Sequence, residues 1–272
     1  MIAWILVLVV IAPGALLAAE VPAACESCHP FEQEQIAATA HARLLGGDGR
    51  PGCQGCHGEN PEHGISDGKT PIFAFKGLTS REINERCLAC HAEKPAVPGF
   101  QRSEHAQGGL NCLQCHHPHL YKSKSAILIT AQPVELCQSC HVEVKAQFRL
   151  DEHHRVPEGA LTCMDCHEPH GSMNQHQLKG AGDSVCFKCH MEKRGPFLFE
   201  HAVVRAEGCM TCHVPHGSAN RHLLKQQEVR LLCLSCHPVH PQFINQATTR
   251  FQDCTRCHVK IHGSNFSPRF FE

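Results

Sequence analysis

All twenty cysteines of this 272-residue chain fall into C-x-x-C pairs, and a histidine follows the second cysteine of every pair. The ten motifs are Cys25/Cys28/His29, Cys53/Cys56/His57, Cys87/Cys90/His91, Cys112/Cys115/His116, Cys137/Cys140/His141, Cys163/Cys166/His167, Cys186/Cys189/His190, Cys209/Cys212/His213, Cys233/Cys236/His237 and Cys254/Cys257/His258. Two thiols at this spacing can form thioethers with the two vinyl groups of one haem, and the adjacent imidazole can then ligate the iron. Zinc ribbons and disulfide frameworks need no histidine at this fixed position. The motifs therefore predict ten covalently attached c-type haems, each with a proximal histidine.

The remaining histidines are candidates for the second ligand of each iron. The chain has 24 histidines, and ten lie in the motifs, which leaves fourteen. Position within the repeat favours ten of them as distal ligands: His41, His63, His105, His119, His154, His170, His201, His216, His240 and His262. His153 is an alternative to His154, while His117, His176 and His222 are left over, the last two sharing the register H-G-S-x-N-x-H-x-L-K.

Methionine, the other common axial ligand, is scarce. Outside the first residue and the haem motifs only Met173 and Met191 remain. We therefore expect mostly or entirely bis-histidine haems of low potential. Because two imidazoles close both faces of the iron, this ligation favours electron transfer over substrate chemistry.

The motifs alternate between two types and define an internal repeat. The first type starts at Cys25, Cys87, Cys137, Cys186 and Cys233, whereas the second type starts at Cys53, Cys112, Cys163, Cys209 and Cys254 and continues in its clearest copies into P-H-G-S. This alternation predicts five two-haem repeats within a decahaem domain at 24–272, at approximately 25–86, 87–136, 137–185, 186–232 and 233–272. No catalytic triad or phosphate-binding loop stands out.

The elements that carry these motifs are expected to be short. Proline and glycine interrupt most of the chain, and helices are expected over Phe31–Leu45 and Val142–His154. Without the cysteines and the first 24 residues, roughly 30 % of the residues are apolar, against about 45–50 % in an ordinary domain. The sequence predicts a multihaem cytochrome c fold, mostly irregular with short helices and almost no β-structure, in an elongated array whose core is largely haem.

Charge and the N-terminal segment limit the possible partners and locations. The formal net charge is −1 and no block of like charge occurs, which excludes electrostatically driven nucleic-acid binding. Residues 1–19 are apolar, with a break at Pro13-Gly14, and predict a signal peptide over residues 1–23 that is cleaved after Ala19 or Ala23. An uncleaved membrane anchor is the alternative. Both interpretations predict an exported protein of the periplasm.

The ten motifs and the alternating H…C-x-x-C-H-x-P-H-G pattern resemble the MtrA/PioA/MtoA family of decahaem cytochromes, also called the DmsE family. Each half is also similar to the pentahaem cytochromes that donate electrons to periplasmic nitrite reductase. The chain departs from the pattern after His119, where LYKSKSAILIT replaces G-S-x-N, and in its shortened fifth repeat. The resemblance implies a haem wire that inserts into an outer-membrane β-barrel porin and exchanges electrons with periplasmic and extracellular redox partners, in iron oxidation or metal reduction.

Two other functions remain open from the sequence. One is a soluble periplasmic electron shuttle that donates to a terminal reductase. The other is a multihaem reductase with one open haem, for which the irregular first and fifth repeats around His63, His240 and His262 are the place to look. The direction of electron flow depends on potentials and partners and is not encoded in the motifs.

Overall fold

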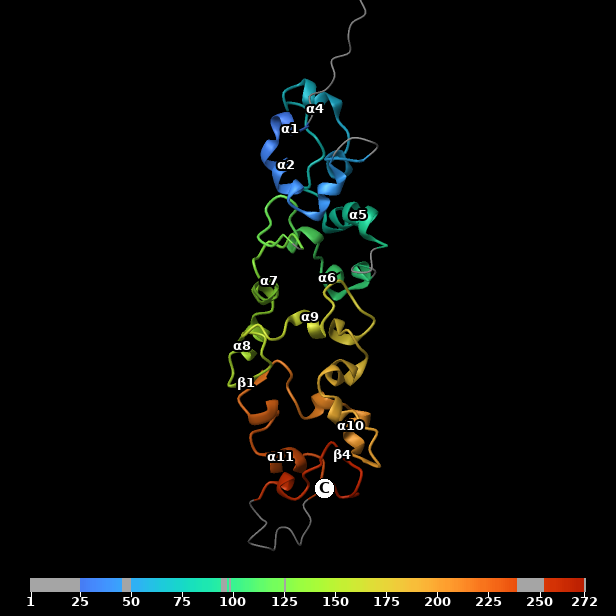
Figure 1. Cartoon of the computed structure of the whole chain (residues 1–272), viewed down its shortest axis with the longest axis vertical. Coiled ribbons are helices and arrows are strands. Elements are labelled where there is room, and N and C mark those ends of the chain that lie inside the picture. Colours follow the sequence, from blue (N-terminus) through green and yellow to red (C-terminus); the bar gives the residue numbers. More distant parts are fainter. Residues whose placement is uncertain are drawn as a thin grey trace, which may run out of the picture. The chain divides into compact units, whose positions relative to one another are not determined.

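The computed structural model describes residues 25–45, 50–93, 97, 99–124, 126–238 and 252–271 (Figure 1). The predicted signal peptide and His240 lie outside these residues. The chain forms two compact units, Met1–Gly77 and Leu78–Glu272, which we describe separately.

The first unit consists of short helices around two haem motifs. Its elements are α1 (Cys25–Cys28), α2 (Pro30–Ala37), the 3-10 helix η1 (Ala40–Leu44), α3 (Gln54–His57) and α4 (Pro61–Ile65). The helix expected over Phe31–Leu45 is interrupted after Ala37. Thr39 causes the break, because its side chain donates to the Ile36 carbonyl and accepts the His41 N–H, which ends one helix and caps the next.

The second unit repeats the same design with eight motifs. Its elements up to the third repeat are α5 (Ser80–His91), η2 (Phe100–Arg102), α6 (Glu104–Gln107), η3 (Cys112–Gln114), α7 (Pro133–Cys140), α8 (Val142–Gln147), β1 (Glu152–His153), α9 (Cys163–Cys166), η4 (Gln175–Gln177) and η5 (Gly182–Lys188). The remaining elements are η6 (Met191–Lys193), β2 (Phe199–Glu200), α10 (Ala202–Ala206), η7 (Cys209–Thr211), β3 (Gly217–Ser218), η8 (Arg221–Leu223), α11 (Val229–Leu234), η9 (Cys254–Arg256) and β4 (Gly263–Ser264).

Two small antiparallel sheets join segments far apart in the sequence. β1 pairs with β3, and β2 pairs with β4, each over two residues. The first pairing corrects the expected helix at Val142–His154, which ends at Gln147. Residues 152–153 form a strand instead, because their backbone groups bond to β3 and this tertiary pairing overrides local helix preference. The expected fold, mostly short helices and irregular chain with few strands, is otherwise confirmed.

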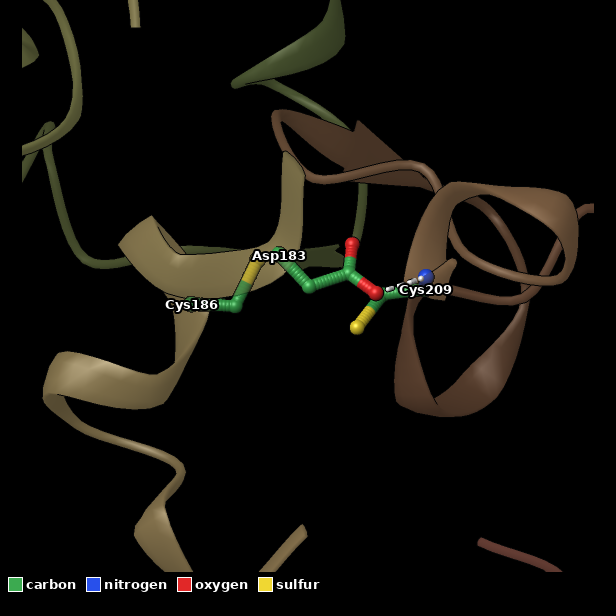
Figure 2. Close-up of side chains that lie close together, drawn as sticks. All are labelled: Asp183, Cys186 and Cys209. Atoms are coloured by element: carbon green, nitrogen blue, oxygen red, sulfur yellow. Dashed lines mark hydrogen bonds between the residues drawn. The ribbon is translucent and has the colours of Figure 1, made fainter. Parts of the chain in front are cut away.

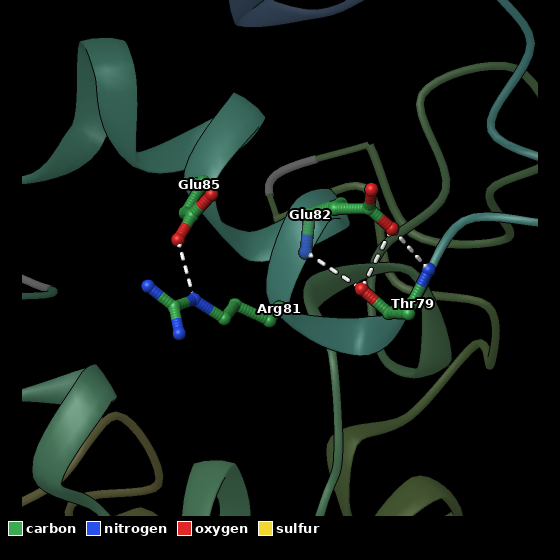
Figure 3. A network of polar contacts seen from close by, with 4 residues as sticks. All are labelled: Thr79, Arg81, Glu82 and Glu85. Carbon is green, nitrogen blue, oxygen red and sulfur yellow. Dashed lines mark hydrogen bonds and ion pairs between the residues drawn. The ribbon is translucent and has the colours of Figure 1, made fainter.

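Helix α5 is the longest described helix and carries the first motif of the second repeat at its end. Its start is fixed by a capping box, in which the Thr79 side chain accepts the Glu82 N–H and the Glu82 carboxylate accepts the Thr79 N–H at 2.8 Å (Figure 3). Arg81 and Glu85, one turn apart, form an ion pair at 2.7 Å on its exposed face. The predicted border between the first two repeats, at residue 86, lies inside this helix.

Protein side chains alone form little core. The buried apolar side chains in the described parts of the chain are Ile83, Leu88, Phe100, Leu128, Phe148, Val156 and Val185. Large apolar side chains elsewhere lie open, such as Phe31 at 60 % exposure and Met173 at 89 %. A polypeptide with so little buried apolar surface cannot offset its conformational entropy. The fold thus needs the large apolar groups that the cysteines can attach.

Candidate haem sites

The two motif types sit on different local structures. First-type motifs lie on helices: Cys87, Cys90 and His91 end α5, and Cys137 and Cys140 lie in α7. Second-type motifs start on single turns such as η3, α9 and η7. In both settings the histidine N–H bonds to the carbonyl of the first cysteine, as in His116 to Cys112 at 2.8 Å. This turn places the two thiols and the imidazole together.

The two cysteines of a motif differ in their exposure. The first cysteine is half-buried in all ten motifs, and the second is half-buried at Cys115 and Cys212. In the other eight motifs the second cysteine is exposed: Cys28, Cys56, Cys90, Cys140, Cys166, Cys189, Cys236 and Cys257. A core made largely of haem predicts enclosed attachment sites, but the polypeptide itself encloses none of these eight residues, because it has few buried apolar side chains to pack around them.

Exposure of the second cysteine is compatible with haem attachment. In four of these motifs the N–H of Cys56, Cys189, Cys236 or Cys257 bonds to the carbonyl of the first cysteine at 3.2 Å, so a tight turn holds the backbone. The side chain on that turn is open to the edge of a large planar group, which would cover it once joined. The role of these residues as haem attachment sites stays a prediction from the motif.

In two repeats, a polar side chain shortly before the first motif hydrogen-bonds to the first cysteine of the second motif. Asn84 Oδ1 accepts the Cys112 N–H at 3.0 Å, and Asp183 Oδ2 accepts the Cys209 N–H at 2.9 Å. Both residues stand three positions before the first cysteine of a first-type motif, Cys87 and Cys186. Sequence analysis missed this pair of residues, although their shared position was visible.

Asp183, Cys186 and Cys209 also form the cluster in the described residues whose ligand atoms lie within 4.8 Å of one another (Figure 2). Figure 2 shows the carboxylate between the two cysteines, which come from separate segments. Both thiols belong to C-x-x-C-H motifs, and the carboxylate already caps the Cys209 N–H. The packing of the two motifs therefore explains the cluster.

Within a repeat, the first cysteines of the two motifs meet. Their free thiols hydrogen-bond to each other, which raises the pKa of Cys87 beside Cys112 and of Cys137 beside Cys163. The same bond lowers the pKa of Cys163 to about 7. The other thiol pairs with this arrangement are Cys25–Cys53, Cys186–Cys209 and Cys233–Cys254.

Between repeats, the second cysteines of neighbouring motifs approach. Burial and then the nearby Cys140 thiol raise the pKa of Cys115. Burial and then the Cys236 thiol raise the pKa of Cys212 in the same way. Cys166 lies near both cysteines of the next motif, Cys186 and Cys189. From Cys87 to Cys254, successive motifs in the second unit are therefore neighbours in the order of the sequence.

Histidines from different segments face each other in pairs. In seven pairs the ring centroids are between 5.9 and 6.3 Å apart: His29–His63, His105–His141, His116–His170, His154–His190, His167–His216, His201–His237 and His213–His262. Each pair joins one motif histidine to one of the distal candidates.

The spacing of these rings fits an intervening metal better than ring stacking. Two in-line metal–imidazole bonds of about 2 Å each put the ring centroids roughly 6.4 Å apart. The interplanar angle varies from 15° in His29–His63 to 63° in His154–His190, while the distance hardly changes. Coordination fixes the distance and leaves rotation about the metal–nitrogen bond free, whereas stacking constrains both. Paired imidazoles, with thiols at the haem-attachment spacing, fit haem iron.

Main-chain carbonyls orient the proximal imidazoles of all five second-type motifs through Nδ1. The carbonyl acceptors are Phe73 for His57, Ala126 for His116, His176 for His167, His222 for His213, and Arg269 for His258. A carbonyl can only accept, so each Nδ1 carries the proton and each Nε2 lone pair is free for a metal.

The loop that presents these carbonyls recurs in the second unit and folds back on its motif. Val214 N–H bonds to the Leu223 carbonyl at 2.7 Å, and Lys225 N–H bonds to the Cys212 carbonyl at 2.9 Å. The turn needs left-handed residues, among them His222 with φ of 59° and Leu223 with φ of 58°. His222, like His176, thus contributes its main-chain carbonyl to the site.

The distal histidines before second-type motifs are oriented by the next repeat. His105 Nδ1 donates to the Pro169 carbonyl at 2.9 Å, and His154 Nδ1 donates to the Pro215 carbonyl. In each case the acceptor immediately precedes another distal candidate, His170 or His216. One short segment therefore orients one imidazole and supplies a second.

Neighbouring repeats of the second unit exchange these histidines. His154 of the third repeat faces His190 of the fourth, and His216 of the fourth faces His167 of the third. The β1–β3 pair lies directly between the two, next to His154 and His216. The same exchange joins the second repeat to the third and the fourth to the fifth.

The glycine of the P-H-G segment is needed where the two repeats meet. A Cβ on Gly217 would lie 2.0 Å from the Gln147 carbonyl oxygen, and one on Gly171 would lie 2.7 Å from the Gly99 carbonyl oxygen. Real Cβ atoms do not approach so closely. The repeating glycine is therefore a packing requirement of the exchange.

The other histidines have distinct positions. His41 lies in η1, and His119 lies in the turn after His116. Both ring nitrogens of His153 are engaged, by the Leu150 carbonyl and by Glu158, which favours His154 as the ligand candidate. His117 Nδ1 accepts the Leu120 N–H at 3.0 Å and belongs to a local turn.

The described residues contain no helix that is both long and apolar enough to cross a membrane. The apolar stretch at the N-terminus lies outside them.

Comparison with known proteins agrees with this site. The family model "Doubled CXXCH motif" matches residues 105–146, 153–195 and 201–242. The fold and the paired motifs thus define a multihaem c-type cytochrome with covalently bound haem.

The chain is 36 % identical over 231 residues to the multihaem cytochrome MtrA of Shewanella baltica (strain OS185), covering 78 % of this chain and 68 % of that protein. It is also 28 % identical over 180 residues to the C-type polyhaem cytochrome OmcC of Geobacter sulfurreducens (strain ATCC 51573 / DSM 12127 / PCA), covering 58 % of this chain and 22 % of that protein. The chain belongs to the MtrA-type family of multihaem cytochromes, which are electron-transfer proteins.

Proposed function

We propose that the chain is an exported decahaem cytochrome that carries electrons across the outer membrane within a β-barrel porin partner. One haem is attached at each C-x-x-C-H motif, and each iron is held by two imidazoles. The likeness to MtrA, 36 % identical over 231 residues, supports this assignment.

The observation that carries the proposal is the order of the motifs in space. In the second unit, first cysteines meet within a repeat and second cysteines meet between repeats, from Cys87 to Cys254. Because the thioethers mark one edge of each haem, the eight haems of this unit follow one another with neighbouring edges. An electron can then pass from haem to haem without a mobile carrier.

The proposed ligands are the predicted ones. The seven facing pairs support both partners in each, while His41, His119 and His240 are proposed as the remaining distal ligands for His57, His91 and His258 as a group. Imidazoles on both faces leave no open coordination position, so the haems exchange electrons and bind no substrate. The bound haem would supply the one-electron iron chemistry, and the polypeptide orients the imidazoles.

The proposed location is the periplasm, with insertion into the porin. Its partners are the porin together with periplasmic and extracellular cytochromes or other redox proteins.

The test is gentle detergent extraction of outer membranes, followed by a native gel with haem stain and identification of co-migrating proteins. A stoichiometric β-barrel protein is the expected partner. A haem band confined to the soluble periplasm would favour the shuttle, and ligand binding by nitrite or hydroxylamine with a high-spin ferric signal would favour the reductase.

A further inference from the structure

One of the exchanged imidazoles is held by a side chain where its neighbours are held by main chain. Gln147 is the last residue of α8 in the third repeat. Its Oε1 lies 3.1 Å from Nδ1 of His216, a residue of the fourth repeat. Across this contact the His216 ring faces His167, which belongs to the same repeat as Gln147.

We propose that Gln147 is a positioning residue for the haem attached at Cys163 and Cys166, holding the distal His216 in place and setting the potential of that haem. The proposal rests on the bis-histidine ligation proposed above. The Oε1 atom accepts the hydrogen bond from the Nδ1 proton, which leaves the Nε2 lone pair of His216 free to bind an iron.

The surroundings of His216 strengthen this hydrogen bond. Phe148, buried to 7 % exposure, packs against the His216 ring with centroids 5.6 Å apart. Burial lowers the pKa of His216, with further lowering by the nearby His167. A hydrogen bond shielded from water in this way is electrostatically stronger than an exposed one.

The main chain of Gln147 fixes the same contact from a second side. Its carbonyl oxygen lies against Gly217, the residue after His216, so closely that a methyl group there would be 2.0 Å away. The side chain and the backbone of Gln147 thus clamp the short segment that carries the ligand. Both are needed because the ligand arrives from another repeat.

The equivalent distal histidines have different groups at this place. Nδ1 of His170 lies 3.6 Å from a Glu168 carboxylate oxygen. His262 is buried near the Lys193 ammonium, and both lower its pKa, to about 4. The three equivalent distal candidates therefore differ in the nearby polar group, which is a carboxylate for His170, an amide for His216 and a cation for His262.

The strength of the hydrogen-bond acceptor at His216 Nδ1 determines the direction in which the haem potential is expected to shift. A stronger acceptor draws the proton away from the ring, makes the imidazole a better donor and stabilises Fe³⁺ over Fe²⁺. Gln147→Glu should therefore shift one haem to lower potential. Gln147→Leu removes the acceptor and should shift the same haem to higher potential.

The experiment is a potentiometric titration of the intact holoprotein followed by low-temperature EPR. Gln147→Glu and Gln147→Leu are expected to move one midpoint in opposite directions and leave nine in place. The EPR anisotropy of that haem, which depends on the angle between its imidazole planes, should broaden in Gln147→Leu because the ring is freed. The charge-matched control is Gln227→Glu, an exposed site at which the described contacts include no imidazole.

The outcomes separate this proposal from the one on which it rests. If His216→Ala leaves every haem low-spin, the bis-histidine assignment at His167 is wrong. If His216→Ala converts one haem to high-spin but the two Gln147 variants shift no midpoint, or shift it in the same direction, Gln147 has no positioning role. A shift of equal size in Gln227→Glu would show a general charge effect and would also overturn the proposal.

Discussion

The first unit and the second unit solve the same ligation problem in opposite ways. In the first unit His29 faces His63, and both residues belong to the first repeat. In the second unit the six facing pairs each join two neighbouring repeats. In the described residues, His29 is therefore faced from within its own repeat, whereas the paired motif histidines of the second unit are faced from a neighbouring repeat.

The sequence of the first repeat reflects this difference. His63 follows His57 by six residues, whereas His170 and His216 follow their motif histidines by three. His63 lies within α4, and the Thr70 carbonyl accepts a hydrogen bond from its Nδ1 at 2.7 Å. The longer spacing thus accompanies a distal candidate that faces a motif histidine of its own repeat.

The largest effect is expected from removal of all haem. This change tests whether either unit folds without haem. The chain produced in cells that cannot attach haem should lose essentially all ordered structure in both units, because buried apolar side chains are too few. Far-UV circular dichroism and limited proteolysis measure this. A protease-resistant first unit in the haem-free chain would show that the self-contained repeat has a protein core.

Loss of a single distal histidine should have different effects in the two units. His63→Ala should leave one high-spin haem in the first repeat and no change in the second unit. His216→Ala should leave one high-spin haem and also loosen the third repeat against the fourth, since β3 follows this residue directly. EPR gives the spin states, and hydrogen exchange at residues 152–153 reports the β1–β3 contact. Protected exchange there in His216→Ala would contradict a shared junction.

Substitution of Gly217, between the third and fourth repeats, should change the EPR signals of two haems. Gly217→Ala forces the Cβ against the Gln147 carbonyl and should cost about 1–3 kcal/mol in the free energy of unfolding. The displaced segment carries His216 and the Pro215 carbonyl that orients His154, so two haems should change their EPR signals.

The control for this change is Gly159→Ala. Its φ of +77° makes alanine strained, but nothing lies within 4 Å of the added methyl group. It should cost about 1–2 kcal/mol with all haem signals intact. Equal haem spectra in the two variants would rule out the proposed link between haems.

A smaller effect is expected at the cap of α5. Thr79→Ala removes the side chain that accepts the Glu82 N–H and should cost about 0.5–2 kcal/mol in the free energy of unfolding. Arg81→Ala, which breaks only the exposed pair with Glu85, is the matched control and should have a smaller effect. Denaturant unfolding monitored by circular dichroism compares them. An Arg81 variant as unstable as the Thr79 variant would contradict the role of the cap.

The smallest effect is the pH dependence of that cap. Hydrogen bonds from the Thr79 side chain and backbone lower the pKa of Glu82 in the folded chain. A lowered carboxyl pKa stabilises the fold above the unfolded pKa, and this contribution disappears as the pH falls through the folded pKa. The stability difference between Thr79→Ala and the original chain should therefore shrink below about pH 4. A difference that grows on acidification would contradict this sign.

The sequence predicted which histidines take part in the facing pairs but not which histidine faces which. The C-x-x-C-H motifs and the repeat position of the distal histidines were sufficient to select all seven distal partners seen in pairs. Which histidine faces which depends on contacts between residues 34 to 54 positions apart, from His29–His63 to His116–His170. No local pattern encodes such long-range contacts.

Two kinds of site residue escaped prediction for physical reasons. The carbonyls of Pro169 and His222 act through the main chain, which every residue has, so their identity carries no signal. Gln147 lies 69 positions from His216 and has no motif. The cap of α5, in contrast, is predictable from the sequence, because T-x-x-E starting at Thr79 is the pattern of a capping box.

The exchange of ligands between repeats is tested most directly by locating the irons. Anomalous diffraction from crystals of the oxidised holoprotein, measured at the iron edge, gives each iron position independently of the surrounding chain. We expect ten iron peaks, one of them between Nε2 of His167 and Nε2 of His216 and another between His154 and His190. An iron at His167 whose opposite ligand is water or a residue of the third repeat would contradict the exchange.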